Sequence, residues 1–329
     1  MSDIEQEVFD TIRYFDIFDM PITATQIWRS LVVDRSGTGV RWHGRHAVSL
    51  GQIRAILQQS GWLKERVASK WGYYGLINSV GRKDDNMRKY VRRRLVRHAL
   101  AQYKWKKARR VIRYLAPLPF VRMIGVTGSL ALWQVRPQSD FDLLLIVKRG
   151  RIWTARLFLL LVSQMMGRRR KHWEGEAPDK VCLNHYITDN ALMMVPPVRS
   201  LYTAMLYTHL IPVMGPGVYR RWLVANGTWM RRWLMYPMAP KLTWQQAIQV
   251  PCLVRTIKRW VEGLLLEPAG EILERAAERV QRRNILLHDE PGRGGRVAIS
   301  NTELAFHPDS KEAHVLHRFA EEYGQGKLL

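Results

Sequence analysis

The chain has 329 residues, 47% of them hydrophobic, which is enough for two or three domains with separate cores. Its 52 lysines and arginines against 28 acids give a formal net charge of +24, which predicts a polyanionic partner, nucleic acid in the first place and an anionic membrane surface in the second. Cys182 and Cys252 are too few for a disulfide framework or a cysteine zinc site. No apolar run reaches the length of a transmembrane segment, and the acidic start of the chain lacks a signal-peptide pattern, so we expect a cytoplasmic protein.

Residues 1–80 predict a winged-helix-like domain. Apolar residues from Ile4 to Ile17 recur at helical spacing, and TATQIWRSLVV opens with threonines that can cap a second helix. A third helix is expected in SLGQIRAILQQSG, with Ser49 as its cap and Gly61 as its end. WLKERVA and KWGYYGLI then predict the two strands of a hairpin. The module is nearly neutral, so a protein-contact or purely structural role is at least as well supported as nucleic-acid binding.

Residues 81–120 predict a basic helical connector of one or two helices. They carry 14 basic and 2 acidic side chains, half of the net charge of the chain. This concentration favours a stripe that binds the phosphates of RNA or another polyanion, with a solvated linker helix as the alternative. The residues predicted to bind nucleic acid are Arg88, Lys89, Arg92, Arg93, Arg94, Arg97, Lys104, Lys106, Lys107, Arg109 and Arg110.

Residues 121–194 predict a core domain of three strands, VRMIGVTG, DFDLLLIV and KVCLNHYI, with helices between them. The first strand ends in Gly128-Ser129, where a helix begins, and backbone N–H groups and the Ser129 hydroxyl can hold phosphate oxygens there. Asp140 and Asp142 open the second strand and point to the same face, where they repel each other unless a positive group lies between them. Their oxygens can share Mg²⁺, or Mn²⁺, with the same phosphates.

This arrangement resembles the DNA polymerase β-like nucleotidyltransferase superfamily. The shared pattern is an apolar strand, Gly-Ser, about ten residues, and Asp-x-Asp within an apolar strand; here ten residues separate Ser129 from Asp140. The resemblance covers about residues 121–190. It implies an α/β (α+β) core with a mixed sheet flanked by helices. It also implies Mg²⁺-dependent transfer of a nucleoside monophosphate from a nucleoside triphosphate, with release of pyrophosphate.

The superfamily usually supplies a third carboxylate from a later strand, and this chain departs from that pattern. We expect Asn184 at this position, where a neutral amide can bind Mg²⁺ but cannot accept a proton. His185 is a candidate for the base, with a structural role on the strand as the more common alternative. The acids that flank the strand, and that could replace the missing carboxylate from a loop, are Glu174, Glu176, Asp179 and Asp189.

Residues 195–288 predict a mainly helical domain, in which VRSLYTAMLYTHLIPVM forms one apolar helix, and residues 289–329 predict a loop-rich tail. We expect the second wall of the nucleotide site to come from residues 195–240. Within this domain Trp222, Trp229 and Trp233 alternate with pairs of arginines, an arrangement that suits either base stacking or an aromatic core with solvated arginines.

Three hypotheses of function follow. The first is a Mg²⁺-dependent nucleotidyltransferase that acts on RNA or another nucleic-acid-associated acceptor. The second is a catalytically degenerate core that binds nucleic acid or serves as a regulatory module. The third keeps the chemistry but transfers the nucleotide to a protein or a small molecule.

Overall fold

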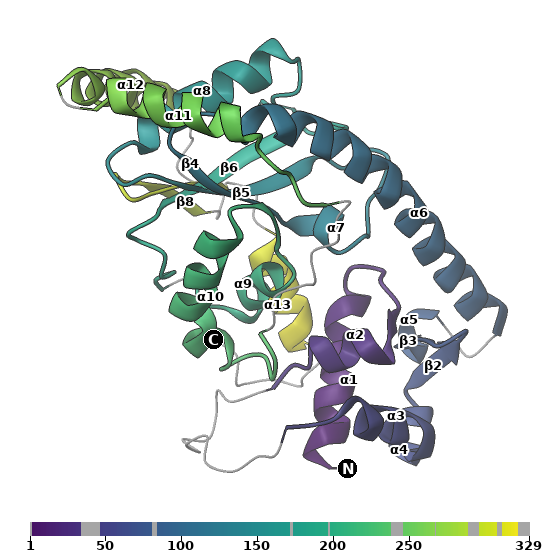
Figure 1. Ribbon diagram of the computed structural model, residues 1–329. Coiled ribbons are helices and arrows are strands. Elements are labelled where there is room, and N and C mark those ends of the chain that lie inside the picture. Colours follow the sequence, from purple (N-terminus) through teal and green to yellow (C-terminus); the bar gives the residue numbers. More distant parts are fainter. Residues whose placement is uncertain are drawn as a thin grey trace.

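The computed structural model describes residues 2–33, 47–80, 84–171, 174–196, 198–237, 246–266, 268–288, 296–307 and 311–321. Figure 1 shows a small N-terminal module at one end, a sheet covered by helices at the other, and one long helix that runs along both. In the described part of the chain, no helix is long and apolar enough to span a membrane.

The N-terminal module contains the three predicted helices (α1, α2 and α3) and the predicted hairpin (β2 and β3), together with two four-residue helices and a two-residue strand. In chain order its elements are α1 (Asp3–Asp16), β1 (Ile22–Thr23), α2 (Ala24–Arg29), α3 (Leu50–Gln59), α4 (Gly61–Lys64), β2 (Val67–Lys70), β3 (Tyr73–Leu76) and α5 (Ile77–Val80). Ser2, Thr23 and Ser49 each cap a helix in a capping box. The sheet has the order β1-β3-β2. One prediction is wrong: Trp62 and Leu63, expected at the start of a strand, belong to α4, because Ser60 caps a further helical turn.

The basic connector is one helix, α6 (Asp84–Leu115), of 32 residues, which spans about 48 Å at 1.5 Å per residue. Its N-terminal part packs on β2 through Met87 and Tyr90, and its C-terminal part packs on α7 (Gly128–Ala131) and α8 (Ile152–Met165). The helix thus joins the N-terminal module to the sheet along one continuous rod (Figure 1).

A six-stranded mixed sheet forms the centre of the larger part of the molecule. Its strands are β4 (Val121–Val126), β5 (Phe141–Val147), β6 (Val181–Thr188), β7 (Ile211–Met214), β8 (Arg296–Ile299) and β9 (Glu303–His307). The order is β7-β4-β5-β6-β9-β8, in which β5 and β6 are parallel and the other neighbours are antiparallel. The predicted mixed sheet flanked by helices is therefore present.

Side chains of β5 alternate between two hydrophobic layers. Phe141, Leu143 and Leu145 pack with α6, α8 and α12 (Ala269–His288) on one face. Leu144 and Ile146 pack on the other face with α9 (Leu201–Thr208), α10 (Pro216–Met230) and α13 (Glu312–Glu321). Because strand residues alternate, Asp140 and Asp142 belong to this second face, the side covered by α9 and α13.

Two C-terminal predictions are wrong for the described residues. Residues 211–214, expected to continue a helix, form the edge strand β7, since a short apolar run carries no periodicity that separates strand from helix. Residues 296–299 and 303–307, expected in a loop-rich tail, complete the sheet as β8 and β9, and α13 follows. The sheet therefore combines strands from the predicted core domain, the predicted helical domain and the predicted tail. Residues 289–295 lie outside the described residues.

Candidate functional site

The turn that follows β4 lies directly against the start of β5. The backbone N–H of Thr127 donates to the carbonyl oxygen of Asp142 at 3.0 Å. Gly128 has a φ of +64°, and a Cβ at this position would lie 2.5 Å from Oδ2 of Asp142. Glycine is favoured here, because side chains rarely adopt this backbone conformation and a Cβ would displace the Asp142 carboxylate. The Gly128-Ser129 turn and the Asp142 carboxylate are therefore neighbours, although fourteen positions separate Gly128 from Asp142 in the chain.

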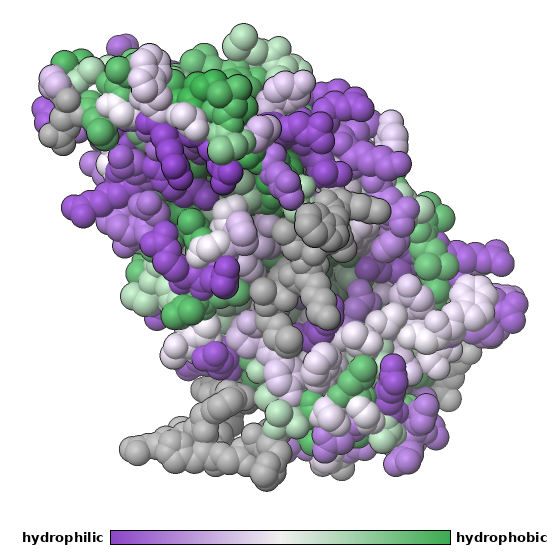
Figure 2. All heavy atoms as spheres, viewed as in Figure 1, coloured by the Kyte–Doolittle hydropathy of each residue, from purple (hydrophilic) through white to green (hydrophobic). Residues whose placement is uncertain are grey.

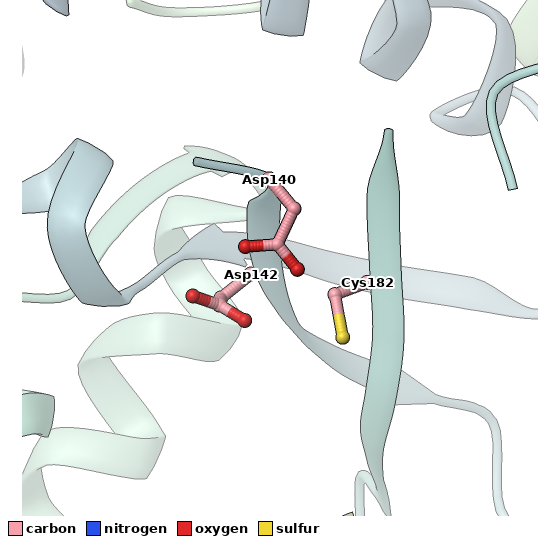
Figure 3. Close-up of side chains that lie close together, drawn as sticks. All are labelled: Asp140, Asp142 and Cys182. Carbon is pink, nitrogen blue, oxygen red and sulfur yellow. The ribbon is translucent and has the colours of Figure 1, made fainter. Parts of the chain in front are cut away.

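Asp140 and Asp142 meet the thiol of Cys182 on the neighbouring strand. Ligand atoms of these three side chains lie within 4.8 Å of one another. Figure 3 shows the side chains pointing toward one another from the start of β5 and from β6. Across the residues that the structure describes, this is the only group of three histidine, cysteine or acidic side chains close enough to share a metal ion.

Arg170 supplies positive charge to this cluster. Its Nη1 donates to Oδ2 of Asp140 at 2.5 Å and lies 3.9 Å from Sγ of Cys182. The backbone N–H of Arg170 is held by the carbonyl oxygen of Val181, which fixes this segment beside β6. The guanidinium therefore balances one of the two carboxylates, and the sequence alone did not single out this residue.

The charges of the cluster perturb its protonation. Burial, and then the negative charge of Asp140, raise the pKa of Asp142 to about 7, although Arg170 and Lys311 oppose the shift. Burial also raises the pKa of the Cys182 thiol, so that it stays protonated at neutral pH. The pKa of Tyr202 on α9 rises to about 12, mainly through burial and in part through the charge of Asp142. Tyr202 and Lys311 thus belong to the surroundings of Asp142, on the face of the sheet that α9 and α13 cover.

The register between β5 and β6 decides which residue lies opposite Asp142. Asp142 pairs with Cys182 in the parallel ladder, and the register shifts before Leu144, which pairs with His185. Two residues of β6, Leu183 and Asn184, therefore oppose a single residue of β5. In this register the residue opposite Asp142 is Cys182, and Asn184, which we expected at the third-carboxylate position, lies two residues further along β6.

The loop acids do not replace the missing carboxylate. Glu174 pairs with Lys180 at 2.5 Å, and Asp179 pairs with Lys104 and Lys107. Asp189 accepts a hydrogen bond from the backbone N–H of Arg149, and Glu176 is exposed. None of the four joins Asp140 and Asp142 in the group of potential metal ligands.

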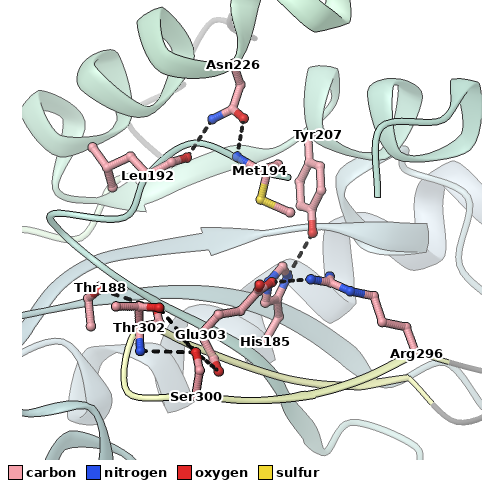
Figure 4. Close-up of polar contacts among 10 residues, drawn as sticks. All are labelled: His185, Thr188, Leu192, Met194, Tyr207, Asn226, Arg296, Ser300, Thr302 and Glu303. Carbon is pink, nitrogen blue, oxygen red and sulfur yellow. Dashed lines mark hydrogen bonds and ion pairs between the residues drawn. The ribbon is translucent and has the colours of Figure 1, made fainter. Parts of the chain in front are cut away.

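His185 has a structural role. Its Nε2 lies 3.0 Å from Glu303 of β9, and its Nδ1 lies 2.8 Å from the Tyr207 hydroxyl of α9. Figure 4 shows these contacts together with Arg296, which also pairs with Glu303. Burial lowers the pKa of His185, so the ring is neutral at neutral pH. With both ring nitrogens engaged inside the protein, His185 is not placed to act as a base.

Two of the predicted nucleic-acid contacts are interior residues. Arg94, 4% exposed, donates to the carbonyl oxygens of Leu132 and Trp133 and to the Gln134 side chain. Lys104, 2% exposed, donates to the carbonyl oxygens of Pro137 and Ser139. Both cations hold the loop that leads from α7 into Asp140, so the prediction that they contact nucleic acid is wrong.

The other basic residues of α6 divide into paired and outward-facing side chains. Arg88 pairs with Asp84, Arg97 with Asp19, and Lys107 with Asp179, while Arg109 reaches the carbonyl oxygen of Ala247. Five other basic side chains of the predicted set are exposed and face solvent along the helix. We call them the outer stripe: Lys89, Arg92, Arg93, Lys106 and Arg110.

The tryptophans of α10 belong to the core. Trp222 is fully buried and Trp229 is nearly so, while Arg220 and Arg221 are exposed. Of the two interpretations of this segment, an aromatic core with solvated arginines is the one observed.

A cavity of about 680 Å³ lies away from the aspartates, between the end of α6, β7 and α11 (Cys252–Leu264). Arg122, Lys258 and Glu262 line it, and Arg122 and Glu262 are paired with each other. None of the site residues named above lines this cavity, so the chemistry of the side chains identifies the site better than the cavity does.

Comparison with known proteins yields no match, whether with protein-family models, curated proteins or solved structures. Function must therefore be argued from the site itself.

Proposed function

We propose that the protein is a metal-dependent nucleotidyltransferase, which moves a nucleoside monophosphate from a nucleoside triphosphate to an acceptor hydroxyl. The observation that carries this proposal is the close placement of the Gly128-Ser129 turn against Asp142, with Asp140 on the same face. This pairing of a Gly-Ser turn with two carboxylates supports the proposal, because the sequence pattern that encodes it resembles that of the DNA polymerase β-like superfamily.

The donor set fits a divalent cation. Carboxylate oxygens are the ligands that Mg²⁺ and Mn²⁺ prefer, and Asp140 and Asp142 present theirs to a common point. Burial, and then the charge of Asp140, raise the pKa of Asp142, and a bound cation would oppose both effects. A bound divalent ion would neutralise phosphate charge and make the acceptor hydroxyl easier to deprotonate.

Arg170 and Ser129 are the protein groups that we assign to the triphosphate. Arg170 is bonded to Asp140 here, and its guanidinium is suited to phosphate oxygens once a cation takes its place on that carboxylate. Ser129 contributes its hydroxyl from the turn. Because α7 has only four residues, we assign phosphate binding to this hydroxyl and the N–H groups of the turn rather than to a helix dipole.

A second function is favoured by one observation, the thiol at the third position. Cys182 is protonated at neutral pH, so neither a third charged ligand nor a carboxylate base stands opposite Asp142. In that case the core would bind nucleoside triphosphate without turnover and serve as a regulatory or nucleic-acid-binding module. We favour the active enzyme, because a core freed from catalysis does not require both aspartates.

RNA is the acceptor that we propose, and the outer stripe of α6 is its contact. Lys89, Arg92, Arg93, Lys106 and Arg110 form an exposed basic surface on α6, the helix that packs against α7 and holds the loop before Asp140. The N-terminal module has the element order of a winged helix, and its near-neutral charge suits protein contact or a structural role. Transfer to a protein or a small molecule in the cytoplasm is the alternative.

The test is an incubation of the protein with each labelled nucleoside triphosphate, with Mg²⁺ or Mn²⁺, and with RNA, protein and metabolite fractions in turn. The proposal predicts metal-dependent incorporation of label into one fraction, RNA first, with release of pyrophosphate. Binding of triphosphate and metal without incorporation into any fraction would support the regulatory alternative. No binding at all would contradict both functions.

A further inference from the structure

Helix α11 is attached to the protein by its polar face. Lys258 donates to the carbonyl oxygen of Val121 at 2.6 Å, and Glu262 accepts from the backbone N–H of Phe120 and from Arg122. Its apolar side chains point outward: Leu253, Ile257, Trp260 and Leu264 are all more than half exposed, Trp260 by 67%. Their spacing of four, three and four residues places them on one stripe of the helix. No residue of α11 is buried.

Helix α12 also presents exposed apolar side chains. Ala277 and Ile285 of α12 face the core, whereas Ile272, Val280 and Leu287 on its outer side are exposed. Figure 2 shows hydrophobic side chains gathered at the upper end of the molecule, where Figure 1 places α8, α11 and α12, with strongly hydrophilic side chains beside them. A contiguous exposed surface of this kind marks an interaction site.

Arginines border this apolar surface. Arg279 and Arg283 are exposed on the outer side of α12 between Ile272, Val280 and Leu287. Arg255 and Arg259 are exposed on the polar side of α11, where they line the cavity beside Lys258 and Glu262. Each acid of the two helices has a partner: Glu262 pairs with Arg122, Glu274 accepts from the backbone of α8, and Glu271 and Glu278 pair with Arg275 and Arg282 on α12 itself. The surface is thus both apolar and positive.

We propose that α11 and α12 dock the protein onto an anionic membrane surface, lying in the plane of the interface without crossing it. The tryptophan and aliphatic stripe of α11, together with the exposed arginines and aliphatic residues of α12, is typical of interfacial binding. Nucleic acid would use the arginines but offers little to Leu253, Ile257 and Leu264. A second copy of the chain is disfavoured, since each copy carries a formal charge of +24.

The test uses the full-length protein without nucleotide, so that its outcome is independent of the proposed activity. Co-sedimentation is measured with vesicles of phosphatidylcholine alone and of phosphatidylcholine with phosphatidylglycerol. We expect binding only to the anionic vesicles. Trp260→Ser with Leu264→Ser should weaken it by about tenfold or more, whereas Val224→Ser, which alters an exposed apolar residue of α10, should leave it unchanged.

A second pair of variants tests whether the vesicles bind α12 in particular or respond to positive charge anywhere on the protein. Arg279→Gln with Arg283→Gln should weaken binding by about fivefold for each arginine. Arg110→Gln with Arg113→Gln removes the same charge from α6 and should have a much smaller effect. Three results would overturn the proposal: no binding to anionic vesicles, equal effects of the two arginine pairs, or a lipid-free dimer that Trp260→Ser with Leu264→Ser dissociates.

Discussion

Asp142 and Cys182 are partners in the parallel ladder of β5 and β6, and Cys182 therefore occupies the position where a third carboxylate would complete the proposed metal site. We expect Cys182→Asp to increase the affinity for Mg²⁺ and to raise turnover, most clearly at low Mg²⁺, because it adds a charged oxygen ligand. Asn184→Asp is the matched control, which adds the same charge two residues along β6. Steady-state rates across a Mg²⁺ titration measure both variants; a larger gain from Asn184→Asp would contradict the assignment of the third position.

The repulsion between Asp140 and Asp142 predicts a pH-dependent gain in stability on removing one charge. The folded state raises the pKa of Asp142 to about 7, so this carboxyl destabilises the metal-free fold increasingly as the pH rises from about 4 to about 7. Asp142→Asn should therefore increase the free energy of unfolding by roughly 1 to 2 kcal/mol at about pH 8 and have little effect near pH 4. Denaturant unfolding of the metal-free protein measures it.

Asp85→Asn is the control for this measurement, since Asp85 is an exposed carboxylate at the start of α6. Its replacement should change the free energy of unfolding little at either pH. A loss of stability in the Asp142→Asn protein at the higher pH would contradict the prediction, because it would show that nearby positive charge already stabilises the Asp142 carboxylate in the folded protein.

His185 predicts a pH effect of opposite sign. Burial lowers its pKa in the folded state, so the unfolded chain takes up this proton first, and stability is lost as the pH falls below about 6.5. His185→Gln should be less stable at neutral pH by about 1 to 3 kcal/mol, because Glu303 and Tyr207 lose a partner. The deficit should shrink toward about pH 5, as measured by denaturant unfolding. An equal deficit at both pH values would contradict a buried neutral ring.

The outer stripe of α6 predicts a steep salt dependence of RNA binding. Replacement of Arg92, Arg93, Lys106 and Arg110 with Gln should flatten the slope of log affinity against log salt by about two to three units. Arg94→Gln is the contrasting variant: its side chain is interior, so it should lower the free energy of unfolding by about 1.5 to 3 kcal/mol and leave the slope unchanged. Fluorescence anisotropy at several salt concentrations provides the slopes. If the fourfold variant kept the parental slope, the stripe would be a solvated face.

The part of the site that sequence predicts is the part encoded locally. A strand, a turn and a second strand that follow one another in the chain place Gly128 beside Asp142. The positive φ of Gly128 is predictable because glycine is the residue that adopts this conformation most readily. Cys182 could not be predicted, because its position depends on how β6 aligns with β5 and on a register shift that has no sequence signature.

Sequence alone also does not predict which basic residues are buried or which short segments form the edges of the sheet. Arg94 and Lys104 resemble their solvated neighbours in sequence, and only the tertiary structure shows that they bind the carbonyl oxygens of the loop before Asp140. The strands β7 and β8 have four residues each, too few for periodicity to decide between helix and strand. Helix α11 has an amphipathic sequence, but this pattern alone does not predict that the polar face points inward.

The measurement that tests the account most directly is metal-dependent transfer of labelled nucleoside monophosphate by the parent protein and by Asp142→Asn, with Asp85→Asn as the control. The account predicts that the parent and Asp85→Asn incorporate label in the presence of Mg²⁺ or Mn²⁺, and that Asp142→Asn is folded but incorporates none. Incorporation by folded Asp142→Asn at the parental rate would contradict it.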